Sequence, residues 1–248
     1  MNTKLAIVTG ASSGIGHAIA QALHPLGYHL VLLGRNTERL KSVSMSLPGS
    51  EYYQCDLDDV DQVTKISSSL ASSFKDKNFN RVILVNNAGI VSRMPFSENS
   101  MEEWQKKFQV NLFSPAIFTQ GLLPFLKDQK EARIINISSS LGLRPIPNTS
   151  IYSASKAALN SLTQALALEL APLKIPVNAI CPGIVETPIQ EFYQTQDAKL
   201  REQLNAAQPI GRIGQPEDIA KVVCFYAENA SEWITGTLVP VDGGILLV

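Results

Sequence analysis

Short apolar segments rich in β-branched residues alternate along this chain with longer segments in which apolar residues recur at helical spacing. The longer segments predict helices at Ile15–Leu26, Glu38–Leu47, Val60–Phe74, Met101–Leu126, Ser153–Leu170 and Glu217–Tyr226. The shorter segments predict strands at Leu5–Thr9, Leu30–Leu33, Tyr52–Gln54, Val82–Val85, Ile134–Ser138, Val177–Ile180 and Leu238–Val241. Near-continuous apolar strands are typical of a parallel sheet that is buried on both faces. The pattern therefore predicts one doubly wound α/β domain, with a mostly parallel seven-stranded sheet and helices on both faces.

One long irregular segment interrupts this alternation before the last strand. It runs from Cys181 to Gly214 and begins with Pro182-Gly183. Connections in compact domains are usually short, and longer ones usually serve as lids or binding loops. We therefore expect a substrate lid at about residues 183–214, with a plain surface excursion containing a short helix as the alternative.

Length and composition limit the possible classes of protein. The chain has 248 residues, which suits a single domain over residues 1–248, and its formal net charge is −1. This charge gives no long-range attraction to nucleic acid or anionic lipid, so neither is expected as a partner. No segment resembles a signal-peptide core or a membrane-spanning helix, and we expect a cytoplasmic protein.

Histidine and cysteine are scarce, which narrows the candidate chemistry. The three histidines lie within the first thirty residues, and the three cysteines are far apart in sequence. No CxxC, HxxxH or HExxH spacing occurs, so no metal site is expected, and the scattered cysteines suit reduced thiols. A hydrolase triad usually needs a histidine base, so an enzyme with this sequence is expected to use another proton donor.

The first predicted strand runs directly into a glycine-rich turn, and a predicted helix follows it. The turn reads Thr9-Gly10-Ala11-Ser12-Ser13-Gly14-Ile15-Gly16. Glycines at such a turn let the backbone approach a pyrophosphate and let the helix pack closely on the strand. The first helical turn then presents free N–H groups and the positive end of its dipole to the phosphates. The alternative is a plain strand–turn–helix junction, but the position in an α/β pattern favours a dinucleotide site.

The end of the second predicted strand indicates which dinucleotide binds. An NAD site usually carries an acidic residue there, whereas this chain has Gly34, Arg35 and Asn36. The Arg35 guanidinium can form a charge-assisted fork with a 2′-phosphate, and Asn36 can add a donor. We therefore expect NADP(H) to be preferred over NAD(H), the alternative being that Arg35 only pairs with Glu38. Two residues that end the third strand would flank the adenine, Asp56 and Leu57.

Tyr152 and Lys156 are four residues apart in a segment of helical period, so both side chains lie on one helix face. A free phenol has a pKa of about 10 and is a poor acid or base at neutral pH. A neighbouring ammonium and the positive nicotinamide of an oxidised cofactor would favour the phenolate and lower that pKa. Taken alone, this spacing is also found in surface pairs on ordinary helices.

Further motifs accompany this pair in a fixed order. Ser139 lies thirteen residues before Tyr152, Asn86-Asn87-Ala88-Gly89 follows the fourth predicted strand, and Asn111 lies within the Met101–Leu126 region. With the glycine-rich turn, they resemble the short-chain dehydrogenase/reductase family. The resemblance covers the whole chain, including the late segments Pro182-Gly183, Gly211–Asp218 and Val241–Gly244.

The resemblance implies a Rossmann-fold oxidoreductase that transfers a hydride between NADP(H) and a carbonyl or secondary alcohol. Tyr152 would be the general acid in reduction and the base in oxidation, and Lys156 would lower its pKa and bind the nicotinamide ribose. Ser139 would hold the substrate oxygen, and Asn111 would anchor a water that relays protons. The implied cofactor-binding residues are Gly10, Ser12, Ser13, Gly14, Ile15, Gly16, Arg35, Asn36, Asp56, Leu57, Asn87, Ala88, Gly89, Tyr152, Lys156, Pro182, Gly183, Ile184 and Thr187.

The expected substrate pocket is mostly apolar and suits a ketone or aldehyde of moderate polarity. Its predicted substrate-binding residues are Ser139, Leu141, Tyr152 and Val185, with Ile146, Ile189, Phe192 and Tyr193 nearby. Arg93 and Arg144 could receive an anionic group, although exposed loop arginines are more often only solvated.

Two alternative functions remain open at this point. Within the family, a 3-oxoacyl-[acyl-carrier-protein] reductase of fatty-acid synthesis docks an acidic carrier through basic residues flanking the cleft. Lys130 matches one such position, but the other is Leu173, with Lys174 next to it. The second alternative is a catalytically silent dinucleotide-binding scaffold, which would not need the four catalytic residues. The resemblance also implies a homotetramer or a homodimer.

Overall fold

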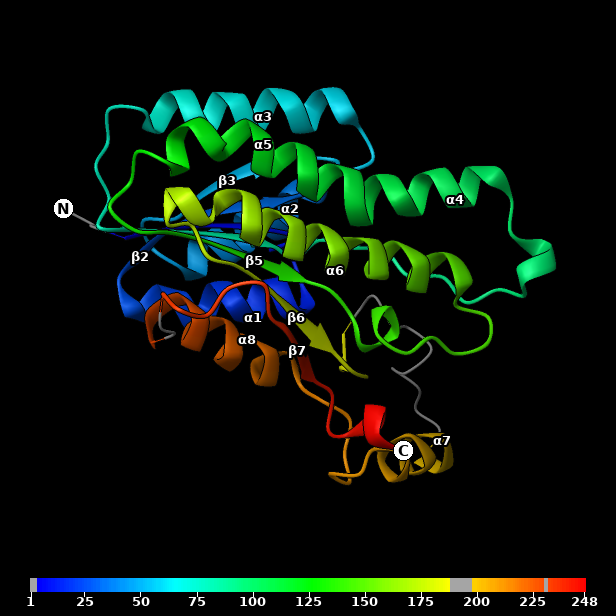
Figure 1. The fold of residues 1–248 in the computed structure, drawn as a ribbon. Helices are drawn as coiled ribbons and strands as arrows, with labels where there is room; N and C mark the ends of the chain where they lie inside the picture. The colour runs from blue at the N-terminus through cyan, green and yellow to red at the C-terminus, as the bar shows by residue number, and fades with distance from the viewer. Residues whose placement is uncertain (1–3, 188–197, 230–231) are drawn as a thin grey trace.

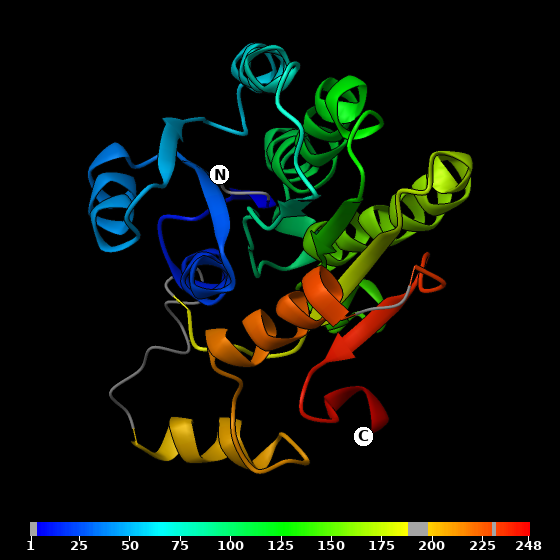
Figure 2. The ribbon, with the colours of Figure 1, turned by 90° about the vertical axis from the view of Figure 1, so that its left-hand side faces the viewer.

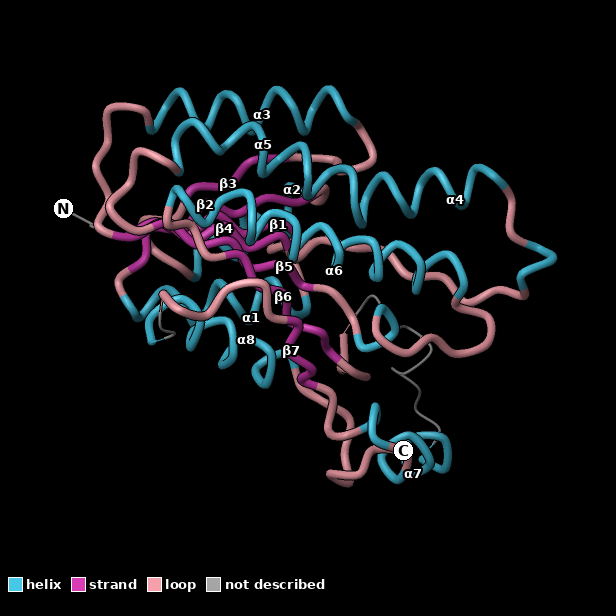
Figure 3. Tube along the Cα trace, viewed as in Figure 1, coloured by secondary structure: helices cyan, strands magenta, loops and turns pink. Residues whose placement is uncertain are grey.

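Seven strands form one sheet at the centre of the molecule (Figures 1 and 3). The computed structural model describes residues 4–187, 198–229 and 232–248. The strand order is β3-β2-β1-β4-β5-β6-β7, and every neighbouring pair is parallel. The order reverses between β1 and β4, which confirms the predicted doubly wound sheet. The strands are β1 (Lys4–Thr9), β2 (Tyr28–Gly34), β3 (Glu51–Gln54), β4 (Arg81–Asn86), β5 (Ala132–Ile137), β6 (Val177–Pro182) and β7 (Leu238–Val241).

Helices cover both faces of the sheet, as Figure 2 shows from one end. One face carries α1 (Gly14–Leu23), α2 (Thr37–Ser46) and α8 (Pro216–Cys224). The other carries α3 (Val60–Phe74), α5 (Ser114–Leu126) and α6 (Ser150–Leu170). Two more helices extend beyond the sheet (Figure 1), α4 (Met101–Phe108) and α7 (Ala198–Ala206).

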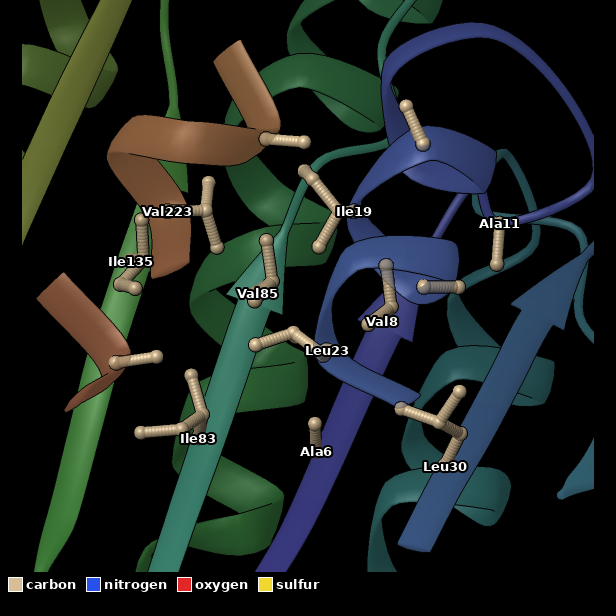
Figure 4. Close-up of a cluster of buried hydrophobic side chains, with 14 of the residues drawn as sticks. Ala6, Val8, Ala11, Ile19, Leu23, Leu30, Ile83, Val85, Ile135 and Val223 are labelled. Atoms are coloured by element: carbon tan, nitrogen blue, oxygen red, sulfur yellow. The ribbon is translucent and has the colours of Figure 1, made fainter. Parts of the chain in front are cut away.

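In the central strands, successive residues enter opposite halves of the core. In β1, Ala6 and Val8 belong to the buried cluster that contains α1 and α8, part of which is shown in Figure 4. Leu5 and Ile7 belong to the cluster on the other face, with α3 and α5. Because all four side chains are fully buried, the strand reads as a continuous apolar run, as predicted. This packing fixes the carboxyl ends of the strands, from which the site loops emerge.

The predicted helix over Met101–Leu126 is interrupted by a π-helical turn. Between α4 and α5, residues Gln109–Phe113 form this turn, in which the Ser114 N–H donates to the Gln109 carbonyl. Pro115 has no N–H, so an α-helical bond to the Asn111 carbonyl cannot form. Such π-bulges often occur at functional sites, and this one contains Asn111.

Other elements differ from the prediction in their bounds. Helix α6 begins at Ser150, before the predicted start at Ser153, so Tyr152 lies inside its first turn. The predicted lid contains a helix, α7, and α8 is followed by a second π-helical turn at Phe225–Asn229. Among the residues that the structure describes, no helix is long and apolar enough to cross a membrane.

Candidate active site

A cavity of about 960 Å³ lies at the carboxyl ends of the strands. Loops that follow β1 to β6 line it, at the place where the strand order reverses, and this is where doubly wound sheets bind ligands. Every predicted cofactor-binding or substrate-binding residue lines the cavity except Gly16. Three of the four predicted catalytic residues also line it, the exception being Asn111.

The glycine-rich turn after β1 brings backbone rather than side chains to the cavity. Gly10 and Gly14 have positive φ angles of 67° and 54°, a region that favours glycine. A Cβ atom at Gly16 would collide with the Gly10 carbonyl, so this glycine allows α1 to pack on the turn and does not line the cavity. The Ser13 side chain caps no N–H group of α1, which leaves the first helical turn available to a phosphate.

Asn87 holds the glycine-rich turn against the loop that follows β4. Its Nδ2 donates to the Thr9 carbonyl at 2.9 Å. The Thr9 hydroxyl in turn accepts from the backbone N–H groups of Asn87 and Ala88, at 3.0 and 3.1 Å. These bonds fix the two loops that flank the predicted pyrophosphate position. Thr9 was not predicted as a site residue, although it precedes the first glycine directly.

A second polar network supports the catalytic elements from within the core. Asn86 Nδ2 donates to Asn136 Oδ1 at 2.9 Å and to Thr119 Oγ1 at 3.1 Å, and Asn136 Nδ2 donates to Thr163 Oγ1 at 2.9 Å. All four side chains are buried, and they join β4 and β5 to α5 and α6. The sequence indicates this network only through Asn86 and Asn136, which are amide residues in strands that are otherwise apolar.

The end of β2 presents positive charge to the cavity. Arg35 and Arg39 both line the cavity and are exposed, although only Arg35 was predicted. The alternative that Arg35 pairs with Glu38 is wrong, because Arg35 forms no ion pair with any described residue. Asn36 Oδ1 accepts from the Arg39 N–H at 2.9 Å and so caps α2, which leaves its Nδ2 as the donor facing a ligand.

Tyr152 and Lys156 lie one turn apart on α6, with Lys156 Nζ 6.0 Å from the centre of the Tyr152 ring. Lys156 is 3% exposed, and its Nζ donates to the Ile137 carbonyl at 2.9 Å. Burial lowers the pKa of Lys156 to about 8. Burial raises the pKa of Tyr152, and a hydrogen bond with Ser139 opposes this rise.

The expected lowering of the Tyr152 pKa by Lys156 is therefore not seen in this structure. The ammonium donates to the Ile137 carbonyl at the end of β5, and the desolvation of the phenol is the largest influence on its pKa. At neutral pH the Tyr152 phenol keeps its proton, which is the form that a general acid requires.

Three consecutive serines follow β5 and line the cavity, and each makes different contacts. Ser138 Oγ donates to the Lys156 carbonyl at 3.2 Å and so ties β5 to α6. Ser139 Oγ accepts from the Leu141 N–H at 3.1 Å, and Ser139 lines the cavity together with Tyr152. Ser140 begins a short 3₁₀ helix. The assignment of Ser139 to the substrate oxygen stays a prediction.

Asn111 lies behind the cavity rather than on its wall. Its Oδ1 accepts from the Ile90 N–H at 2.9 Å, and its Nδ2 donates to the Ile90 carbonyl at 3.0 Å and to Ser155 Oγ at 3.0 Å. The Asn111 Oδ1 and Lys156 Nζ atoms both lie against Gly89, each 3.3 Å from where its Cβ would stand. Asn111 therefore couples the loop after β4 to α6, next to the lysine.

The first residues of the predicted lid are anchored by ionic and backbone contacts. Arg201 of α7 holds both carboxylate oxygens of Glu186, at 3.0 and 2.7 Å, and Gln215 Nε2 donates to the same carboxylate at 3.0 Å. Val185 pairs with Gly214 as a parallel bridge. Three predicted lid residues lie outside the described residues, namely Ile189, Phe192 and Tyr193.

More residues line the cavity near the predicted substrate site than the sequence analysis predicted. The predicted Leu141, Ile146 and Val185 line it, as do Arg93 and Arg144. Arg144 Nη1 donates to the Leu246 carbonyl at 3.1 Å and also to the Val248 carbonyl. Several apolar residues that were not predicted also line the cavity, among them Ile90, Val91, Ile245, Leu246 and Val248.

A glycine-rich dinucleotide turn beside a tyrosine, a serine and a buried lysine defines a Rossmann-fold oxidoreductase site. A family model described as enoyl-(acyl carrier protein) reductase matches residues 10–246. The Rickettsia prowazekii 3-oxoacyl-[acyl-carrier-protein] reductase FabG is 35% identical over 99% of this chain and 98% of its own length. The Bos taurus L-xylulose reductase is 34% identical over 98% of this chain and 96% of its own length.

A solved structure, the Pseudomonas aeruginosa RhlG/NADP active-site complex, superposes with a TM-score of 0.90 at 30% identity. The match covers 99% of this chain and 97% of that chain. The chain belongs to the short-chain dehydrogenase/reductase family, and it is an oxidoreductase that acts on carbonyl or alcohol groups with a nicotinamide cofactor. The two curated relatives act on different substrates at almost the same identity, so identity alone does not select the substrate.

Proposed function

We propose that this protein is an NADP(H)-dependent carbonyl reductase in which Tyr152 is the general acid. The observation that carries the proposal is that Tyr152, Ser139 and Lys156 meet in one cavity with the glycine-rich turn. In the reverse direction, the same tyrosine would be the general base for oxidation of a secondary alcohol.

The residues of the cavity fit a dinucleotide that carries a 2′-phosphate. The turn after β1 offers backbone N–H groups to a pyrophosphate, and Asp56 and Leu57 lie at the third strand, where an adenine would fit. The Arg35 guanidinium has no described ion-pair partner at the place where an NAD site holds a carboxylate. Thr187 and Ile184 would contact the nicotinamide end, next to Pro182 and Gly183.

A bound nicotinamide cofactor supplies the hydride, and the side chains of this chain orient and neutralise the substrate. Ser139 and Tyr152 donate hydrogen bonds to the carbonyl oxygen, on which negative charge develops. Tyr152, whose raised pKa keeps its phenol protonated at neutral pH, then transfers its proton to that oxygen, because the alkoxide that forms is the stronger base. The Lys156 ammonium donates to the Ile137 carbonyl and lies 6.0 Å from the centre of the Tyr152 ring, so it would replace the lost proton through a bridging hydroxyl or water.

The route by which Lys156 recovers a proton would pass Asn111. The carbonyl of Asn111 lacks an α-helical partner because Pro115 has no N–H, and the Asn111 side chain lies with Lys156 against Gly89. A water on this carbonyl would connect the buried ammonium to solvent. The proposed role of Asn111 is therefore that of an anchor behind the cavity.

The proposed function is tested by following NADPH and NADH oxidation with a panel of ketones, aldehydes and short β-ketoacyl thioesters. We expect turnover of at least one carbonyl class, with a higher kcat/KM for NADPH than for NADH. Absence of turnover with every compound, in a protein that binds NADPH, would favour the silent scaffold instead.

Replacing Arg35 by alanine is expected to weaken NADPH binding about 30-fold, or about 2 kcal/mol, because a charge-assisted contact with the 2′-phosphate is lost. NADH lacks this phosphate, so its dissociation constant is expected to change less than threefold. The measurement is the dissociation constant of each cofactor by fluorescence titration. Lys41→Ala is the matched control, because Lys41 is an exposed cation on α2, the helix that begins just after Arg35, and it does not line the cavity. Equal weakening of both cofactors in R35A would contradict the NADP(H) preference.

The wild-type rate of reduction is expected to fall above about pH 8. Burial lowers the pKa of Lys156 to about 8, so its ammonium form is present below that pH and is lost above it. The raised pKa of Tyr152 keeps the phenol protonated across the same range, so the decline belongs to the lysine. The measurement is kcat at saturating NADPH and substrate as the pH is raised. A plateau that continues to the ordinary lysine pKa would contradict the assignment.

The alternative of a carrier-protein reductase receives little support from the placement of its docking residues. Lys130 precedes β5, and Leu173 and Lys174 precede β6, whereas the cavity lies after the ends of these strands. A six-residue strand spans about 20 Å. These residues therefore lie at the amino ends of the strands, away from the cavity at the carboxyl ends, and do not flank the cleft of their own chain. A free ketone or aldehyde therefore remains the proposed substrate class.

We also propose a cytoplasmic homotetramer, or a homodimer. The three cysteines are free thiols, as expected in a reducing compartment. Exposed apolar side chains on α4, the π-helical turn and α6 are suited to contacts between copies of the chain, namely Met101, Phe113 and Leu168. Light scattering coupled to size-exclusion chromatography would measure the oligomeric state.

A further inference from the structure

The segment after β7, residues 242–248, runs past the substrate end of the cavity. Ile245, Leu246 and Val248 line the cavity, whereas Leu247 does not and is 89% exposed. In Figure 1 this segment is the red turn near the C label. The sequence alone gave no role to these apolar residues in the site.

The start of this segment is fixed to the loop that follows β6. The Gly183 N–H donates to the Val241 carbonyl at 3.1 Å, and a Cβ at Gly183 would stand only 2.7 Å from the Asp242 Cα. The Asp242 carboxylate then accepts from the N–H groups of Gly244 and Leu246, at 3.0 and 3.1 Å. Asp242 thereby sets the turn that directs the following residues to the cavity.

Two further contacts hold the segment along its length. On one side, the Ile210 N–H donates to the Gly243 carbonyl at 3.1 Å, in the connection between α7 and α8. On the other side, Arg144 donates to the Leu246 carbonyl. Because Arg144 is part of the loop that carries Leu141 and Ile146, this bond places Leu246 at the substrate end of the cavity.

We propose that Leu246 is a specificity-determining residue, and that its side chain sets the length of the apolar substituent accepted on the substrate carbonyl. The inference rests on the proposed carbonyl reductase function. Backbone hydrogen bonds hold this segment on both sides, so it cannot easily move aside for a longer substrate. The volume of the Leu246 side chain therefore limits the space available to the substrate. Arg144 is then a positioning residue, which acts by holding the backbone of this wall.

The test compares Leu246→Ala with Leu247→Ala, since the two leucines are adjacent and only the first lines the cavity. The substrates are straight-chain methyl ketones from butanone to decanone, and kcat/KM is measured for each with NADPH. We expect L246A to raise the ratio of long-chain to short-chain kcat/KM about tenfold, as for the removal of a few methylenes from a pocket wall. L246W should lower the same ratio, and L247A should leave it unchanged. R144M should alter the ratio through KM, without changing the dissociation constant of NADPH.

An unchanged chain-length profile in L246A and L246W would overturn the inference, provided that the wild-type protein reduces the ketones. An equal shift in L247A would also overturn it, because the effect would then belong to the segment as a whole. If the wild-type protein reduces none of the carbonyl compounds, the proposed function fails, and the inference fails with it. The wild-type measurement thus separates the two failures.

Discussion

Replacing Tyr152 by phenylalanine is expected to lower kcat for carbonyl reduction about 10³-fold, within the range that a positioned general acid contributes. The substitution removes the phenol proton and one hydrogen-bond donor to the substrate oxygen, while the aromatic ring keeps its packing on α6. Tyr152 and Ser139 both line the cavity, and desolvation raises the pKa of the phenol and so keeps it protonated. The measurement is single-turnover oxidation of NADPH with the best substrate of the carbonyl panel.

The control for Y152F is the dissociation constant of NADPH, which is expected to change less than threefold. Ser139 remains in the variant as a donor to the substrate oxygen, so residual turnover above the uncatalysed rate is expected. If Y152F turned over at the wild-type rate, another residue would have to donate the proton, and the catalytic assignment would be wrong.

Much of the fold could be predicted because burial on both faces leaves a strong periodic signal. Residues Leu5 to Val8 are all fully buried, two on each side of the sheet, so the strand is apolar throughout. The glycine-rich turn could also be recognised, since Gly10 and Gly14 need positive φ angles and Gly16 needs the absence of a Cβ. Strand burial and glycine conformation are both local requirements, and they restrict the residue type at each position, so they can be recognised in the sequence.

The features that escaped prediction depend on contacts between distant parts of the chain. The π-helical turn at Asn111 follows from Pro115 and from the bonds to Ile90, which a helical period does not reveal. The raised pKa of Tyr152 reflects its burial in the assembled site, which outweighs the nearby lysine. The wall formed by Leu246 depends on a hydrogen bond to Arg144, more than a hundred residues earlier.

Two hydrogen bonds at the end of β5 position residues of the predicted catalytic site. The bond from Ser138 to the Lys156 carbonyl joins the end of β5 to α6, and the Lys156 ammonium returns to the Ile137 carbonyl at the same strand end. These two contacts between β5 and α6 therefore position both Ser139, the proposed substrate ligand, and α6, which carries Tyr152. A change at this junction should disturb stability, whereas a change at Ser139 should disturb chemistry.

Replacing Ser139 by alanine is expected to lower kcat about 10²–10³-fold, the usual cost of losing one donor to a developing oxyanion. Ser138→Ala is the matched control, because Ser138 is the adjacent buried serine and its hydroxyl bonds to the Lys156 backbone. That variant should lose about 1 kcal/mol of stability in urea unfolding, with less than a fivefold change in kcat. Both variants should bind NADPH as the wild type does. If S138A and S139A lost equal activity, the serine hydroxyls would act only by holding β5 against α6, and the assignment of Ser139 to the substrate oxygen would be wrong.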